Sequence, residues 1–159
     1  EGLTLNQLIK DACDTNAGTV AISSTEGEFS YQELQRQVSN WIQYIRPKLP
    51  NSSKPIGICF ERSPQMIVSV LTALQSGCPY LPIDSTWPID RIAYILENSS
   101  PSLILTGSRE SQIIEEAKAQ NGHLHPFEVV VVIVSPGEVG RSATFGRLPE
   151  SRLGVLRVR

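Results

Sequence analysis

The sequence LTALQSGCPYLPID, residues 71–84, says more about the fold of this chain than any other stretch. A helical pattern of apolar residues runs into Gly77, and glycine readily takes the left-handed conformation that ends many helices. Pro79 and Pro82 then hold the following backbone extended. The stretch therefore predicts a helix, a sharp turn and a short strand that ends on the carboxylate of Asp84.

The residues just before this stretch complete a strand and helix unit. Residues 55–60 form a short apolar run, typical of a strand that is buried on both faces of a parallel sheet. Ser63 and Pro64 supply an N-cap and a first helical residue. The large apolar residues of this helix are expected to face the core: Met66, Ile67, Val70, Leu71 and Leu74.

A hairpin and a second helix are predicted nearer the N-terminus. Residues 20–23 have a strand pattern, and Gly27 provides the turn into the next strand. Ser30 and Glu33 are spaced as a capping box, in which each side chain satisfies a free backbone donor at a helix start. Pro47 stops this helix. Its predicted apolar face consists of Leu34, Val38, Trp41, Ile42 and Ile45.

Further strands and helices are predicted downstream. Asp84 is expected to cap the helix that begins near Pro88, since a carboxylate suits the free N–H groups of a helix start. Residues 103–106 and 127–134 are short apolar runs that predict buried strands, with a polar helix at 108–120 between them. This alternation predicts an α/β fold with a mostly parallel sheet and flanking helices.

Three segments resemble core motifs of the adenylate-forming enzymes, most closely the amino-acid-activating domains of nonribosomal peptide synthetases. Residues 71–84 are similar to the second core motif, residues 29–34 (FSYQEL) resemble the first, and residues 88–96 continue the likeness. The motif residues that match, all interpreted as structural, are Ser30, Tyr31, Glu33, Leu34, Gly77, Tyr80, Pro82, Asp84, Asp90 and Arg91.

The resemblance implies the N-terminal portion of an adenylate-forming fold, incomplete in a chain of 159 residues. A complete relative would use ATP and Mg²⁺ to convert a carboxylic or amino acid to an acyl-AMP. It would then pass the acyl group to a phosphopantetheine thiol of a carrier, or to CoA. The family's phosphate loop ends in Gly, any residue, Pro, Lys, and that string does not occur in the sequence.

From this absence we predict no catalytic, cofactor-binding or metal-binding residue in the chain. ATP and Mg²⁺ are not expected to bind it tightly, and the chain alone is expected to be inactive. The alternative is a non-catalytic, truncated isoform that acts as a binding or regulatory module.

The resemblance ends near residue 134, which divides the chain into a partial domain at 1–134 and a divergent tail at 135–159. Residues 136–159 carry 5 Arg against 2 Glu, whereas residues 1–135 carry 9 Lys and Arg against 14 Asp and Glu. The tail's isolated apolar residues would bury too little surface to offset the entropy of ordering, so disorder is expected. An edge strand within residues 152–159 is the exception, if a partner strand is present.

Composition argues against several other classes of protein. The net charge is -2 and the tail arginines are dispersed, so nucleic-acid binding is not expected. No apolar run approaches the roughly 20 residues that span a bilayer, and residues 1–10 lack a signal-peptide pattern, which predicts a cytoplasmic protein without a membrane partner. Cys13, Cys59 and Cys78 are expected to be packing residues, and His123 and His125 solvated loop residues.

Overall fold

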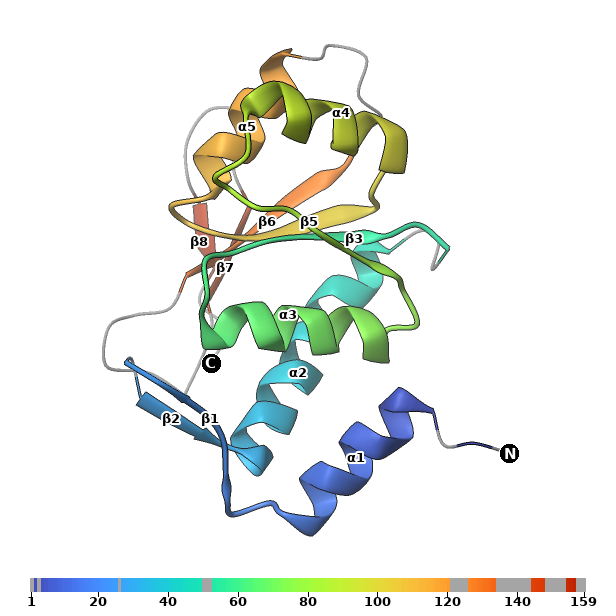
Figure 1. Ribbon diagram of the computed structural model, residues 1–159, viewed down its shortest axis with the longest axis vertical. Coiled ribbons are helices and arrows are strands. Elements are labelled where there is room, and N and C mark those ends of the chain that lie inside the picture. The colour runs from blue at the N-terminus through green and yellow to red at the C-terminus, as the bar shows by residue number, and fades with distance from the viewer. Residues whose placement is uncertain are drawn as a thin grey trace.

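The computed structural model describes residues 2, 4–25, 27–49, 53–120, 126–133, 144–147 and 154–156. Figure 1 shows a sheet with α2 and α3 against one face and α4 and α5 against the other. The elements, in chain order, are α1 (Leu5–Thr15), β1 (Val20–Ser24), β2 (Gly27–Ser30), α2 (Tyr31–Ile45), a 3-10 turn (Arg46–Lys48), β3 (Ile56–Cys59), α3 (Pro64–Gln75), β4 (Tyr80–Pro82), α4 (Ile89–Ser99), β5 (Leu103–Gly107), α5 (Ser111–Gln120), β6 (Glu128–Ile133), β7 (Thr144–Arg147) and β8 (Gly154–Leu156).

The main sheet has the strand order β4-β3-β5-β6-β7-β8. The first four strands are parallel, whereas β7 and β8 join in antiparallel pairing. The predicted α/β fold with a mostly parallel sheet is therefore confirmed. Separately, β1 and β2 form the predicted antiparallel hairpin.

Two segments of the tail that was expected to be disordered form strands instead. Thr144–Arg147 pairs with β6, and Gly154–Leu156 pairs with β7. Pairing satisfies the backbone donors and acceptors along the open edge of β6, a gain that does not depend on side-chain burial. The second strand lies within the segment predicted as an edge strand, but the first was not anticipated. For the rest of 135–159, outside the described residues, disorder stays a prediction.

Each face of the parallel strands packs into its own apolar core. Ile58 and Leu105 face α2 and α3, whereas Ile104 and Val131 face α4 and α5. All four residues of β3 are buried. Strands buried on both faces are typical of parallel sheets covered by helices, and the short apolar runs in the sequence predicted them.

Local hydrogen bonds fix where the helices begin. Thr4 and Gln7 form a capping box at α1, and Ser63 caps α3 with Pro64 as the first helical residue. The predicted apolar face of α2 is confirmed, since Leu34, Val38, Trp41 and Ile45 are buried. In the described part of the chain, no helix is both long enough and apolar enough to cross a membrane.

The buried face of α3 differs from the prediction. Its buried side chains include the small residues Ser69, Thr72 and Ala73. Of the large apolar residues predicted to face the core, Val70 and Leu71 are partly buried against it, whereas Ile67 is 37% exposed. The small residues leave room for close contact with α2 and the sheet. Their hydroxyls do not need outside partners, because Ser69 donates to the carbonyl of Met66 and Thr72 to that of Val68, both at 2.7 Å.

Candidate functional site

The candidate site is the edge of the sheet where the four parallel strands end. From β3 the chain continues into α3 on one face, and from β5 it continues into α5 on the other (Figure 1). Neighbouring parallel strands with diverging connections leave a crevice outside their carboxyl ends, and ligands of open α/β sheets bind there. The ends of β3 and β5 are therefore the place where the topology favours a ligand.

A buried carboxylate joins these two strand ends. Glu110 is 7% exposed, and its Oε1 accepts a hydrogen bond of 3.0 Å from the backbone N–H of Glu61, the second residue after β3. Gly107 ends β5 against the same carboxylate, so that an added Cβ would collide with Glu110. Glu110 therefore ties the loop after β3 to the turn after β5, and its side chain is engaged in holding the backbone.

The thiol at this edge is not reactive. Cys59, the last residue of β3, is fully buried. Burial and then the charge of Glu110 raise the pKa of its thiol to about 12, although a hydrogen bond with Thr106 acts in the opposite direction. A thiol with this pKa is protonated at neutral pH and is a poor nucleophile. Cys13 and Cys78 are also buried and free, so all three cysteines pack as predicted.

Asp84 lies at the carboxyl end of β4 but does not cap a helix, and that prediction is wrong. Its Oδ1 accepts hydrogen bonds from the backbone N–H and the hydroxyl of Thr86, at 2.8 and 2.7 Å. These bonds, the backbone one first, lower the pKa of the Asp84 carboxyl. The helix α4 starts at Ile89 after Pro88, and no side chain caps it.

The first motif lies away from this edge, at the junction of β2 and α2. Ser30 Oγ accepts a hydrogen bond of 3.2 Å from the backbone N–H of Glu33. Glu33 Oε2 in turn accepts from the backbone N–H and the hydroxyl of Ser30, at 2.9 and 3.0 Å. These bonds lower the pKa of the Glu33 carboxyl, the backbone bond most. The predicted capping box is confirmed, with Tyr31 and Leu34 in the first turn that it starts.

The second motif places Gly77 and Tyr80 at the opposite, amino-terminal edge of the sheet. Gly77 has a φ of 74° and donates to the carbonyl of Leu74 at 3.1 Å, while Cys78 donates to that of Ala73 at 3.0 Å. This pair of bonds is a Schellman motif, in which a left-handed residue closes the helix. Tyr80 opens the edge strand β4 and is 44% exposed.

The remaining motif residues stand on the surface near α4. Asp90 lies in the first turn of α4, where a negative charge is favoured by the helix dipole. The Arg91 guanidinium lies 4.4 Å from the centre of the Trp87 ring. Of the motif residues, Pro82 and Asp84 at the end of β4 lie on the candidate edge. The structure therefore spreads the motif residues over several places, and a structural role for all of them stays a prediction.

Sequence reasoning missed Glu110, the residue that organises the candidate site. A carboxylate that follows an apolar strand and a glycine lies near the carboxyl end of that strand, where ligands of open α/β sheets bind. This position is the signal that could have indicated Glu110. That signal is weak in sequence, because the same pattern occurs in solvated turns. The partner of Glu110 is a backbone N–H 49 residues away, which only the tertiary structure could show.

The described residues hold no cluster of metal-ligating side chains. Among them, no group of three or more His, Cys, Asp or Glu side chains could hold a metal ion. At the candidate edge, Glu110 is bonded to the loop after β3 and Asp84 to its own turn. The segment after β6, where the sequence placed the family's phosphate loop, and His123 and His125 all lie outside the described residues.

Comparison with known proteins identifies relatives among peptide synthetases. The family model described as AMP-binding enzyme matches residues 9–150, beyond the predicted boundary at 134. Tyrocidine synthase 1 of Brevibacillus parabrevis is 30% identical over 116 residues, which cover 73% of this chain and 11% of that protein. A mycosubtilin synthase protein of Bacillus subtilis is 35% identical over 102 residues, covering 64% of this chain and 4% of that protein.

Solved structures show the same fold. A benzoate CoA ligase from Burkholderia xenovorans LB400 superposes with a TM-score of 0.72 at 16% identity, over 85% of this chain and 26% of that one. At this identity the likeness concerns the fold alone. The chain thus spans about a tenth or less of these two synthetases, and about a quarter of the solved ligase.

Proposed function

The chain belongs to the AMP-binding enzyme family, and on that basis we propose that it is one part of an ATP-dependent ligase that activates a carboxylic or amino acid as an acyl-AMP. In the complete ligase, the acyl group passes to a phosphopantetheine thiol of a carrier protein, or to CoA. The similarity to tyrocidine and mycosubtilin synthases supports an amino acid and a carrier as the partners.

The role of this chain within the ligase is architectural. The observation that carries this assignment is the linkage of Glu110 to Glu61, because it engages the buried carboxylate at the strand ends in holding backbone. Activation of a carboxylate by ATP needs groups that stabilise charge on the phosphates and a metal site. The sequence has no Gly-x-Pro-Lys string for the phosphates. ATP and Mg²⁺ thus serve the complete ligase, and this chain alone binds neither tightly.

An exchange assay between pyrophosphate and ATP tests this function. The 159-residue chain should give no exchange above background with any of the common amino acids or aryl and fatty acids. A version that continues into the residues encoded downstream should give exchange with at least one acid. Exchange by the 159-residue chain would refute the architectural role, and a silent extended version would refute the ligase assignment.

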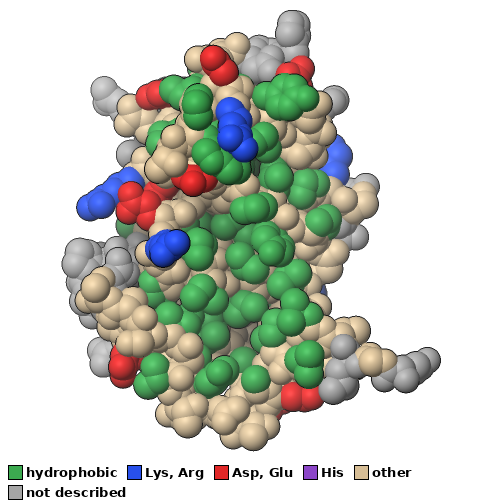
Figure 2. Space-filling view, viewed as in Figure 1, with side chains coloured by type: hydrophobic (Ala, Val, Ile, Leu, Met, Phe, Trp, Pro, Cys, Tyr) green, Lys and Arg blue, Asp and Glu red, His purple; other side chains and the backbone are tan. Residues whose placement is uncertain are grey.

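A second candidate, a non-catalytic binding or regulatory module, is favoured by exposed apolar side chains on α1 and α3. Leu5 is 58% exposed, Leu8 49% and Ile67 37%. Figure 2, viewed as Figure 1, shows apolar side chains gathered over the middle and lower parts of the molecule, where α3 and α1 lie in Figure 1. Apolar patches of this kind mark surfaces that another protein surface covers. This candidate predicts that the extended version stays silent in the exchange assay while the chain copurifies with a stoichiometric protein partner.

The expected cytoplasmic location belongs to the same proposal. All three cysteines are free thiols, which agrees with a reducing compartment. Fractionation of cells that produce the tagged chain should recover it with cytoplasmic markers.

A further inference from the structure

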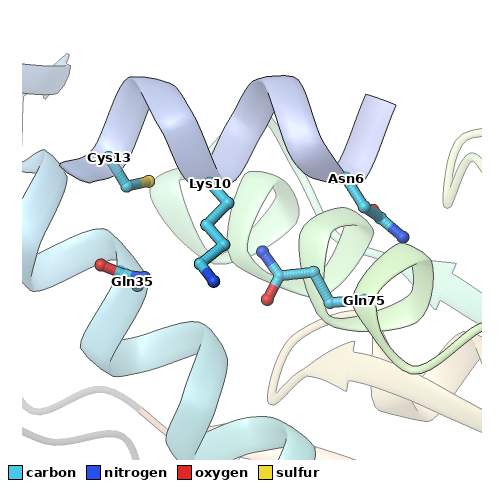
Figure 3. A pocket seen from close by; sticks show the side chains of 5 residues that line it. All are labelled: Asn6, Lys10, Cys13, Gln35 and Gln75. Atoms are coloured by element: carbon cyan, nitrogen blue, oxygen red, sulfur yellow. The ribbon is translucent and has the colours of Figure 1, made fainter. Parts of the chain in front are cut away.

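A groove between α1, α2 and α3 lies apart from the strand ends described above. It has a volume of about 340 Å³ and is lined by Asn6, Lys10, Cys13, Gln35 and Gln75. Figure 3 shows these side chains approaching the groove from the three helices. Gln75 ends α3, whereas the candidate edge is at the start of that helix, so the groove and the candidate edge lie at opposite ends of α3.

Two of the lining residues build the groove rather than offer binding groups. Asn6 Nδ2 donates a hydrogen bond of 3.1 Å to the carbonyl of Leu74, which fixes α1 on the last turn of α3. Cys13 is 4% exposed, and burial, with a smaller effect of Asp14, raises the pKa of its thiol. Cys13 is therefore a neutral wall of the groove.

The other three lining residues have unused hydrogen-bonding groups. Within the described part of the chain, the side chains of Lys10, Gln35 and Gln75 make no hydrogen bond or ion pair. In Figure 3 the Lys10 ammonium and the Gln75 carboxamide extend toward one another across the groove. One positive charge and two carboxamides thus line one hollow. The ammonium supplies donors, and each carboxamide supplies donors and an acceptor.

We propose that this groove binds a small monocarboxylate that carries a further hydroxyl or carbonyl group. The carboxylate pairs with Lys10, since a charge-assisted hydrogen bond is about twice as strong as a neutral one. The carboxamides of Gln35 and Gln75 bind the second polar group. The groove volume of about 340 Å³ falls within the roughly 300–1,000 Å³ of small-molecule sites, so a ligand of this class has room to enter.

The charge of the lining residues favours a monocarboxylate over two other classes of ligand, phosphate and zwitterionic amino acids. Phosphate carries about two negative charges at neutral pH, and the lining offers one cation. A zwitterionic amino acid would bring an ammonium group, and no carboxylate among the described residues lines the groove to receive it. The proposal stands independently of the ligase function, because it uses none of the residues at the strand ends.

A titration of the 15N-labelled 159-residue chain with lactate, followed by NMR, tests the proposal. Backbone amides of Lys10, Gln35 and Gln75 should shift and saturate, with a dissociation constant on the order of millimolar. Lactamide, which has the same shape without the charge, should bind at least about tenfold more weakly. Inorganic phosphate and sodium chloride at equal ionic strength should give no saturable shift at these amides.

Matched substitutions separate a site from general attraction to positive charge. Lys10→Met should weaken lactate binding at least about tenfold, and Lys10→Arg should restore most of it. Lys118→Met makes the same change on α5, on the other side of the sheet, and should leave lactate binding unchanged. Lys10 is exposed, so the variant should fold, which its NMR spectrum shows directly.

Three results would overturn the proposal. They are shifts that rise linearly with lactate without saturating, equal binding of lactamide, and equal effects of the Lys10→Met and Lys118→Met substitutions. Gln75→Leu gives an independent check, because it should weaken lactate binding severalfold while acetate binding, which lacks the second polar group, changes less. Equal losses for lactate and acetate would remove the assigned role of Gln75.

Discussion

The helices α2 and α3 pack against the same face of the sheet, yet the side chains that they bury fully differ in size. On α2 the large apolar residues point inward, and Trp41 and Ile45 are at most 1% exposed. On α3 the inward face combines Val68 with the small residues Ser69, Thr72 and Ala73, while Ile67 is 37% exposed. The difference shows that apolar periodicity marks a helix face without saying which neighbour covers it.

The exposure of Ile67 on α3 has a physical consequence. Burial of an apolar side chain stabilises a fold by about 25 cal/mol for each Å² removed from contact with water. The exposed part of Ile67 therefore adds no such stability to this chain.

The largest expected effect is a matched pair of isoleucine truncations. Ile45→Ala on α2 removes a fully buried side chain and should lower the free energy of unfolding by about 3 kcal/mol. Ile67→Ala on α3 removes a partly exposed one and should cost less than about 1 kcal/mol. Urea denaturation of both variants measures the difference. Equal losses would mean that α3 buries its large apolar face after all.

Overpacking the inner face of α3 should have the next largest effect. Ala73→Leu adds volume at a position with no exposure and should cost about 1–3 kcal/mol. Thr72→Val is the control, because it keeps the size, and the lost hydroxyl donates only within the helix. It should cost less than about 1 kcal/mol. If Ala73→Leu leaves the urea midpoint unchanged, close packing of α3 against its neighbours is contradicted.

The smallest effect concerns the starts of α2 and α3, where each of these two helices has a serine cap. Ser30→Ala on α2 should cost about 1 kcal/mol, since it removes the acceptor for the Glu33 N–H. Ser63→Ala on α3 should cost a similar amount, because Ser63 accepts from the Met66 N–H at 3.3 Å. Thermal melts of the two variants would contradict this comparison if only one lost stability.

The two caps should differ in their response to pH. The pKa of Glu33 in the folded chain lies below its ordinary value of 4.5, so its bonds to Ser30 stabilise the fold above pH 4.5. That stabilisation is lost as the pH falls through the folded value. Glu33→Gln keeps the capping-box pattern without a titrating group. In urea denaturation at several pH values, its free energy of unfolding should therefore fall less below pH 4.5 than that of the unchanged chain. A profile as steep as that of the unchanged chain would contradict the assignment.

Much of the fold could be predicted from local sequence, because the signals were local. The capping box of Ser30 and Glu33 spans three residues, and the turn at Gly77 depends on a conformation that glycine favours. The strand at β3 followed from a short apolar run. The cap at Asp84 was predicted wrongly, because a carboxylate can bond its own turn as readily as a helix end.

The candidate site and the groove could not be predicted in the same way. The bond between Glu110 and Glu61 joins residues 49 positions apart. The groove takes Lys10, Gln35 and Gln75 from three helices. None of these polar residues differs in sequence from those on an ordinary solvated surface, so only their convergence in space distinguishes them.

The sequence by itself therefore determined the order of strands and helices as far as β6, the starts of α2 and α3, and the family to which the chain belongs. These depend on hydrogen bonds and backbone preferences among residues a few positions apart. The tertiary structure decided which face of α3 is buried, the pairing of β7 with β6, the tie made by Glu110 and the groove at Lys10. Each of these depends on contacts between segments far apart in the chain, and no local pattern encodes the partner.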